Sequence, residues 1–252
     1  MLSVTLYELT GATYSMTPKK KGPIQGSSTD IRAYNPLDLR VLVENMARVV
    51  LEQPVHPLGD VPSFKGAGVY IIYYTGDHHL YTAIAAKNRG GKWDQPIYIG
   101  EAARKGARKG GVLAEGPPGP AIWSRLKNHA ESIRDVRDLE IADFWCKYLA
   151  IEDFFIPLCE SLLIDRYMPV WNKVVDGFGN KTLGKNRKGQ QAISMWDLLH
   201  QGRGGAGTST RQKEPRTKDA VIERVQNYLS GKPIALISTA EAIEEAEDEG
   251  QM

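Results

Sequence analysis

The sequence predicts an α+β fold in which a small antiparallel sheet of three strands is flanked by helices. Three apolar runs rich in β-branched and aromatic residues indicate the strands, at residues 68–74, 96–100 and 140–150. Two longer segments carry apolar residues at helical spacing, one at 36–51 and one that follows Pro120. A helical N-terminal extension and a basic C-terminal extension complete the predicted organisation.

Alternation along the first strand divides its side chains between the two faces of the sheet. One face receives Val69, Ile71 and Tyr73, and the other receives Tyr70, Ile72 and Tyr74. The second strand is Pro96-Ile97-Tyr98-Ile99-Gly100, so each strand contains a short string of glycine and tyrosine. A tyrosine in a strand is by default a packing residue. A further role for these tyrosines must therefore be indicated by other residues of the chain.

The first predicted helix has a clear apolar stripe, formed by Leu39, Leu42, Val43, Met46, Val49 and Val50. The string Gly116-Pro117-Pro118-Gly119-Pro120 interrupts any helix, so the second helix begins after it. Its apolar stripe consists of Ile122, Leu126, Ala130 and Ile133. Arg125 and His129 lie four residues apart and therefore share a neighbouring face of this helix.

A third helix is unusually apolar for one that carries a carboxylate. Pro157 suits its first turn. Leu158, Leu162 and Ile164 are expected to be mostly buried, which would hold Glu160 at the edge of the core. A carboxylate fixed among apolar neighbours is a better ligand candidate than a solvated one.

Six residues follow one another in a characteristic order: Tyr70, Tyr98, Arg125, His129, Glu160 and Asn172. Together with the strings Gly68-Val69-Tyr70 and Tyr98-Ile99-Gly100, this order resembles the GIY-YIG nuclease superfamily, over about residues 66–173. The two tyrosines are 28 residues apart, more than in compact family members. Residues 75–95 are therefore predicted to be an insertion, which restriction endonucleases of the superfamily tolerate.

Strings beyond this region resemble the branch of these endonucleases that cleaves GC-rich palindromes. They are Gly177-Phe178-Gly179-Asn180, Gln190-Gln191, Trp196-Asp197-Leu198-Leu199-His200 and Gly202-Arg203. The resemblance implies a type II restriction endonuclease that makes double-strand breaks with Mg²⁺ as cofactor. A repair or mobile-element nuclease with the same module, and a non-catalytic DNA-binding protein, are the alternatives.

The resemblance also implies roles for the six residues. Glu160 would hold Mg²⁺, which needs few protein ligands, and Arg125 would stabilise charge on the phosphate. Either Tyr70 or His129 would activate water, and Tyr98 would orient the substrate. Asn172 would support the site, although a turn or cap residue is its ordinary interpretation.

Basic residues gather on both sides of the predicted site. The last twenty residues contain six acids and no Lys or Arg, so residues 1–232 have a net charge of +8, against +2 for the whole chain. Between residues 181 and 218 there are nine Lys or Arg and two acids. The charge favours contact with DNA phosphates. The expected DNA-binding residues are Arg104, Lys105, Lys185, Arg187, Lys188 and Arg203, and the insertion would serve as a second arm.

Four segments are expected along the chain. They are an N-terminal extension at 1–59, the nuclease module at 60–175, a basic DNA-contacting extension at 176–232, and an acidic tail at 233–252 whose composition is typical of disorder. One set of catalytic residues cuts one strand, so we expect a homodimer on a palindromic site. The segments at 36–51 and 193–199 are its candidate contact surfaces.

Several functional classes lack support in the sequence. There is no P-loop, Rossmann fingerprint or HExxH motif, so no nucleotide cofactor is expected. His78-His79 has no third metal ligand nearby in the sequence, and Cys146 and Cys159 lie in apolar runs that suit a core. Sparse cysteine, with no signal peptide or transmembrane run, predicts a cytoplasmic, bacterial protein without a membrane partner.

Overall fold

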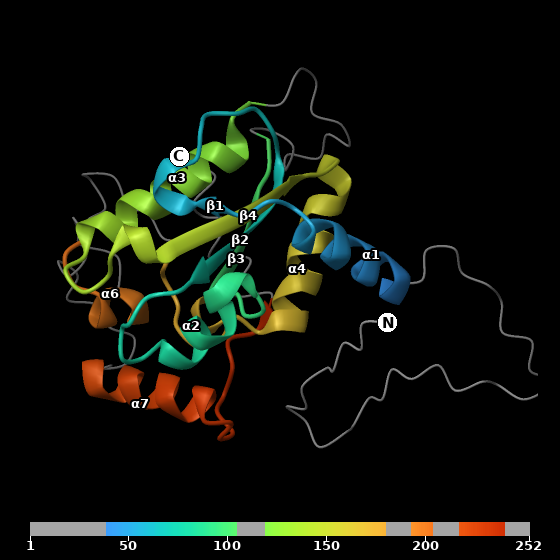
Figure 1. Cartoon of the computed structure of the whole chain (residues 1–252). Helices are drawn as coiled ribbons and strands as arrows, with labels where there is room; N and C mark the ends of the chain where they lie inside the picture. Colours follow the sequence, from blue (N-terminus) through green and yellow to red (C-terminus); the bar gives the residue numbers. More distant parts are fainter. Residues whose placement is uncertain (1–38, 105–118, 180–192, 204–216, 240–252) are drawn as a thin grey trace, which may run out of the picture. The chain divides into compact units, whose positions relative to one another are not determined.

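The structure is a computed structural model that describes residues 39–104, 119–179, 193–203 and 217–239 (Figure 1). The chain divides into two units, residues 1–39 and 40–252, and the fold below belongs to the second. In the part of the chain that the structure describes, no helix combines the length and the apolar character that a membrane crossing requires.

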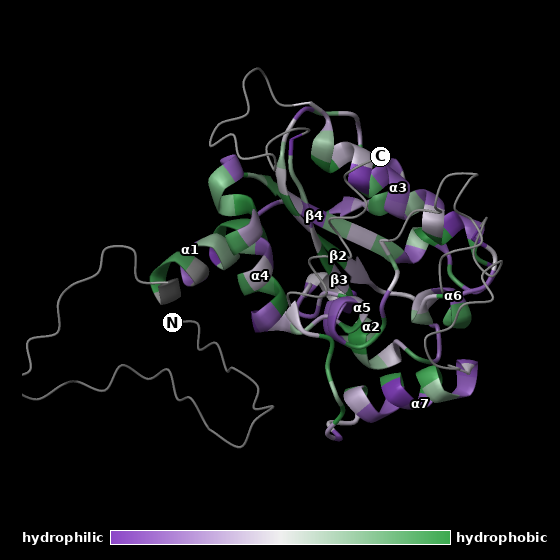
Figure 2. Ribbon diagram, turned by 180° about the vertical axis from the view of Figure 1, so that it is seen from behind, coloured by the Kyte–Doolittle hydropathy of each residue, from purple (hydrophilic) through white to green (hydrophobic). Residues whose placement is uncertain are grey.

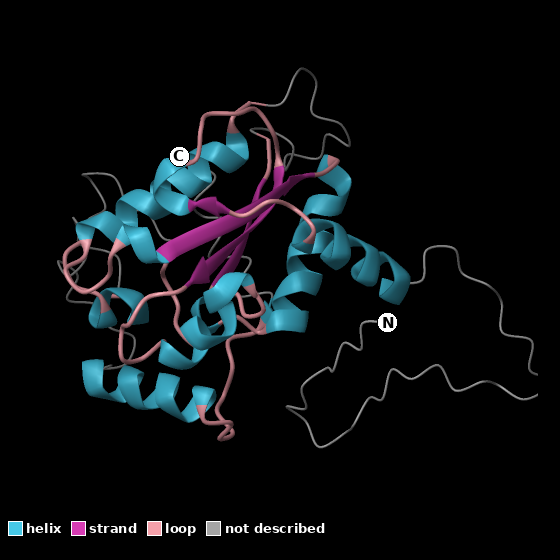
Figure 3. Ribbon diagram, viewed as in Figure 1, coloured by secondary structure: helices cyan, strands magenta, loops and turns pink. Residues whose placement is uncertain are grey.

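One antiparallel sheet organises the second unit (Figure 3). Its four strands are β1 (His56–Pro57), β2 (Gly68–Tyr74), β3 (Tyr98–Ala102) and β4 (Phe144–Ala150), in the spatial order β1-β4-β2-β3. All three predicted strands are present, but the prediction of a three-stranded sheet is wrong. The fourth strand, β1, pairs only two residues with β4, which is too short to give a periodic pattern.

Both faces of the sheet are buried, and every residue of β2 is buried. Helix α3 (Ala121–Asp135) covers the face that carries Tyr70, whereas α4 (Ile156–Tyr167) and α1 (Leu39–Leu51) cover the opposite face. The predicted division of the β2 side chains between two faces is confirmed. Figure 2 shows that α3 carries both hydrophilic and hydrophobic residues. The sheet therefore lies between α3 and α4.

The insertion predicted at 75–95 is folded against the core. It contains α2 (Thr82–Asn88), a helix that the sequence pattern does not indicate, and the inward residues of α2 are buried. The Asn88 side chain closes the base of the insertion. Its Nδ2 donates to the carbonyl groups of Tyr74 and Gln95, and its Oδ1 accepts from the Gln95 N–H. These bonds tie α2 to the end of β2 and to the residues before β3.

The remaining helices are α5 (Val170–Lys173), α6 (Met195–Leu199) and α7 (Lys218–Leu229), with short 3-10 helices at Leu58–Asp60, Arg89–Gly91, Ile141–Asp143 and Asp153–Phe155. Buried residues of α6 and α7, such as Trp196 and Val225, belong to the same core cluster as Tyr70. The apolar island predicted at 193–199 is therefore a core element, and most of it cannot serve as a contact surface.

The glycines of the two tyrosine strings permit close contacts between strands. A Cβ atom on Gly68, whose φ is +154°, would lie 2.0 Å from the carbonyl oxygen of Leu149. A Cβ atom on Gly100 would lie 2.4 Å from the hydroxyl oxygen of Tyr70, its partner across the β2–β3 pair. Any side chain at Gly100 would therefore displace Tyr70.

Candidate active site

Tyr70 and His129 form the central contact of the candidate site. Tyr70 lies within β2, and His129 lies on α3, which covers the same face of the sheet. The Oη atom of Tyr70 is 2.7 Å from Nε2 of His129, and both side chains are buried. A hydrogen bond of this length holds the two groups in place. The two residues predicted as alternative bases are therefore directly joined.

Two further aromatic rings enclose His129. Tyr98 of β3 meets the imidazole edge-on, with ring centroids 5.2 Å apart. Phe178 stacks on the imidazole at 4.8 Å, with 15° between the ring planes, and also contacts Tyr98. No individual role was predicted for Phe178 from the sequence, because a phenylalanine carries no catalytic signature. The two rings fix the plane of the imidazole.

Arg125 lies one helical turn before His129, on the same side of α3. Its side chain is nearly enclosed, with 9% of the residue exposed. A guanidinium is a planar fork of donors that matches the oxygens of a phosphate. Helix α3 therefore brings a cation and an imidazole together over the tyrosines.

Glu160 is fully buried on α4, with 0% exposure, whereas the sequence predicted a position at the edge of the core. Cys159, Leu163 and Ile164 are buried on α4, and Leu158 and Leu162 are partly buried, in agreement with the expectation that the apolar residues of this helix are mostly buried. A carboxylate at this depth requires compensating donors or a cation. Carboxylate oxygens are ligands that Mg²⁺ prefers, so the chemistry of Glu160 fits such an ion.

A second buried carboxylate, Glu101, directly follows the second tyrosine string. It is 1% exposed and pairs with Val69 across β2–β3, so it faces the α4 side of the sheet. Its place after the string was visible in the sequence, but a glutamate at a strand end is by default solvated. Glu101 on β3 and Glu160 on α4 are thus two buried acids of the described residues.

The side-chain amide of Asn172, on α5, holds β3, the outer strand of the sheet, by hydrogen bonds to the backbone of that strand. Strand β3 pairs only with β2, so its other edge needs a partner. The Oδ1 of Asn172 accepts from the Ile99 N–H at 2.9 Å, and its Nδ2 donates to the Ile99 carbonyl at 2.8 Å. The amide therefore imitates a neighbouring strand at the residue between Tyr98 and Gly100.

Two of the expected DNA-binding arginines lie within the described residues. The Nε of Arg104 is 3.2 Å from a carboxylate oxygen of Asp153, and the Arg104 side chain is 25% exposed. The Arg203 guanidinium donates to both carboxylate oxygens of Asp197 and to two backbone carbonyl groups. These four bonds favour a packing role for Arg203 over contact with DNA. The other expected residues, Lys105, Lys185, Arg187 and Lys188, lie outside the described part of the chain.

The sheet, the buried Tyr70–His129 pair and Arg125 one turn away agree with the resemblance to GIY-YIG nucleases. Residues 62–229 match the family model described as the Eco29kI GIY-YIG domain, which spans about two thirds of the chain. The chain therefore belongs to this family of restriction endonucleases and carries a DNA endonuclease domain. A search of curated proteins found no match.

We expect Asn172→Ala to lower the free energy of unfolding by about 2–4 kcal/mol, because it leaves two buried backbone groups of Ile99 unsatisfied. Urea denaturation measures the change. Asn128→Ala is the matched control, since Asn128 is a partly exposed asparagine on α3, and it should change stability by at most about 0.5 kcal/mol. Equal effects of the two substitutions would mean that water replaces the Asn172 amide.

Proposed function

We propose that this chain is a type II restriction endonuclease that uses Mg²⁺ to make double-strand breaks at a specific, GC-rich palindromic DNA site. The observation that carries the proposal is the buried contact between Tyr70 and His129, with Arg125 one turn away, in a chain of the Eco29kI GIY-YIG family. Such a group supplies what phosphodiester hydrolysis requires: a route for the proton of the attacking water and positive charge for the phosphate.

Tyr70 and His129 act in this proposal as one unit that takes the proton from water. A free phenol, with a pKa of about 10, is a poor base at neutral pH. When a neutral imidazole accepts the Tyr70 proton at Nε2, the phenol oxygen can accept the proton of water in turn. The separation of 2.7 Å supports this transfer because neither side chain has to move. The rings of Tyr98 and Phe178 keep the imidazole in plane.

Glu160 would hold Mg²⁺, and Arg125 would contact the phosphate that is cleaved. When bound, Mg²⁺ supplies a Lewis acid that offsets negative charge developing on the phosphate. Arg125 adds two donors in a plane, directed at phosphate oxygens. The proposal includes one cation per active site, because Glu160 is the one carboxylate that the family resemblance assigns to the metal.

The proposed DNA contacts come from Arg104, Lys105, Lys185, Arg187 and Lys188. This part of the proposal is supported by the net charge of +8 over residues 1–232 and by the basic segments that flank the module. Phosphate contacts set the affinity and its salt dependence, whereas the choice of sequence depends on contacts with base edges. The GC-rich palindrome is proposed from the resemblance of the strings after residue 176.

A homodimer would place one active site on each strand of a palindrome. The Tyr70–His129 pair with Arg125 one turn away forms one proposed catalytic set per chain, and one such set serves one strand. Of the two predicted contact surfaces, the α1 helix keeps an apolar residue in solvent, since Val41 is 51% exposed. The other predicted surface, at α6, lies largely in the core. The proposal therefore favours α1 as the contact surface of the homodimer.

Plasmid digestion tests the proposed reaction. We expect the wild-type chain to give discrete DNA bands in Mg²⁺ and none without it. Glu160→Gln keeps the shape of the side chain and removes its charge, so cleavage should fall by about a hundredfold or more while DNA binding persists. Glu152→Gln, at an exposed position shortly before α4, is the control and should cut normally. A smear instead of bands would contradict site specificity, and near-normal cutting by Glu160→Gln would contradict the metal role.

Removal of single hydroxyl and imidazole groups tests the base. Tyr70→Phe should reduce cleavage by about 10²–10⁴-fold with an unchanged circular dichroism spectrum, because only one oxygen is lost. Tyr73→Phe is the matched control in the same strand, since the buried Tyr73 hydroxyl has no hydrogen-bond partner among the described residues. If Tyr70→Phe cuts well while His129→Ala is inactive, histidine is the base and the proposed roles are reversed.

Sedimentation of the protein with a short palindromic duplex tests the dimer. With Ca²⁺ in place of Mg²⁺ to prevent cleavage, we expect two chains per duplex, because both strands must be reached in one encounter. A duplex without the palindrome is the control and should bind more weakly. One chain per palindromic duplex would mean that a monomer cuts each strand in turn.

A further inference from the structure

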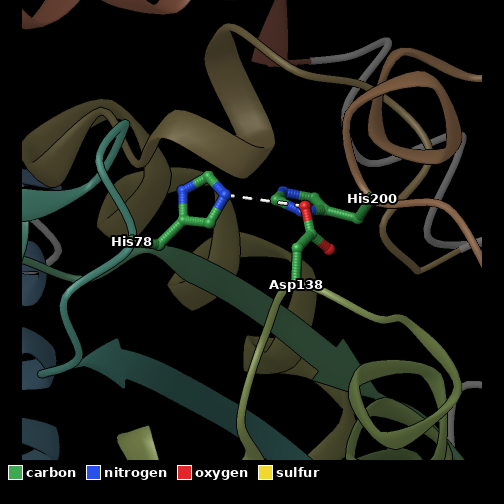
Figure 4. A group of neighbouring side chains, drawn as sticks. All are labelled: His78, Asp138 and His200. Atoms are coloured by element: carbon green, nitrogen blue, oxygen red, sulfur yellow. Dashed lines mark hydrogen bonds and ion pairs between the residues drawn. The ribbon is translucent and has the colours of Figure 1, made fainter.

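His78, Asp138 and His200 come from distant parts of the sequence and meet in the fold (Figure 4). They lie in the loop after β2, in the connection after α3, and directly after α6. The Nε2 of His78 is 3.5 Å from Oδ2 of Asp138, and the Nδ1 of His200 is 3.0 Å from the same oxygen. Two imidazole nitrogens and one carboxylate oxygen therefore converge on a small volume.

The spacing of these atoms suits a transition-metal ion. One ligand atom from each residue lies within 4.8 Å of the other two. Zinc bonds of about 2.0–2.2 Å in a tetrahedral arrangement separate neighbouring ligand atoms by about 3.3–3.5 Å. The separation of 3.5 Å between His78 and Asp138 matches this value, and the separation of 3.0 Å between His200 and Asp138 is slightly shorter. The third, between the imidazoles, requires at most a small shift of His78, which lies on a loop.

Surrounding side chains orient both imidazoles, as is usual around metal-binding histidines. The Nε2 of His200 is 2.8 Å from the hydroxyl oxygen of Tyr81, and that hydroxyl also accepts from the Trp171 indole at 3.0 Å. With its Nε2 occupied in this way, His200 presents Nδ1 to the cluster. The His78 ring stacks on Tyr81 with centroids 5.1 Å apart, and its backbone N–H donates to the Tyr74 hydroxyl.

The cluster is open to solvent on one side. The Asp138 side chain is 33% exposed and that of His78 is 10% exposed, whereas His200 is fully buried. Burial disfavours the charged form of Asp138, but hydrogen bonds from His200 and His78 outweigh it and hold the Asp138 pKa well below its usual range. Burial lowers the pKa of His200. A cation from solvent can therefore reach the Asp138 carboxylate and the His78 imidazole from this open side.

We propose that His78, Asp138 and His200 bind one Zn²⁺ ion at a site separate from the proposed catalytic cation. Imidazole nitrogens favour zinc over Mg²⁺, which prefers oxygen ligands, and a water molecule would complete four-coordination. The ion would tie together the insertion, the α3–β4 connection and α6. The expectation from the sequence that His78 lacks a third ligand is corrected, because the other two ligands lie far from it in the chain.

Zinc content and affinity test the site. The full chain, purified without chelator, is analysed by mass spectrometry of its metals and titrated with Zn²⁺ against a chromophoric chelator in excess Mg²⁺. We expect one Zn²⁺ per wild-type chain. His78→Ala and Asp138→Asn should weaken zinc binding by more than about tenfold, and both sites are partly exposed, so the fold should survive. His79→Ala is the matched control, because His79 is exposed and outside the cluster, and it should bind like wild type.

Glu160→Gln distinguishes this site from the proposed catalytic metal, and it should still bind one Zn²⁺. Circular dichroism of each variant verifies that the chain is folded. A wild-type chain that takes up no zinc in the titration overturns the proposal and leaves the three side chains as a hydrogen-bonded cluster. Unchanged affinity in folded His78→Ala, or loss of zinc in Glu160→Gln alone, would also overturn it.

Discussion

The Tyr70 hydroxyl can occupy its place beside His129 only because residue 100 is a glycine and has no side chain. A Cβ at Gly100 would lie 2.4 Å from that hydroxyl oxygen. The position of Gly100 depends in turn on β3, an edge strand of five residues that pairs with one neighbour. Asn172 supplies the missing edge through two bonds to Ile99. The pairing of the strand backbones therefore determines the contact between Tyr70 and His129. The glycines of the two tyrosine strings permit this pairing, and the tyrosines supply the side chains of the site.

Burial gives this arrangement its chemical character. Tyr70, Arg125, His129 and Glu160 are all buried, although all four carry polar groups that water would otherwise solvate well. Inside a protein, hydrogen bonds and charges interact more strongly than in water. Groups fixed in this way do not reorganise when charge develops on a substrate. The sheet must be covered on both faces for this to hold, and α3 and α4 provide that cover.

The parts of the fold that could be predicted from the sequence are those with a periodic or local residue pattern. The alternation in β2, the stripe of α3 and the helix start at Pro157 are local patterns, and each is present. The strand β1 and the helix α2 were missed because two residues and seven residues give little periodic signal. The contact between Tyr70 and His129 could be anticipated from the order of the residues, because the resemblance joins them. The packing of Phe178, the depth of Glu160 and the bonds of Asn172 required the structure, since each depends on neighbours distant in sequence.

One layer of aromatic rings joins the candidate active site to the histidine–aspartate cluster. Phe178 stacks on His129 and lies 4.4 Å from Trp171, ring centroid to centroid. The Trp171 indole donates to Tyr81, whose hydroxyl lies against His200. Rings packed at this density transmit displacement, because little space exists for them to relax independently. A continuous row of contacts therefore runs from the His129 imidazole through Phe178, Trp171 and Tyr81 to His200, and it packs the insertion and the residue after α6 against the candidate site.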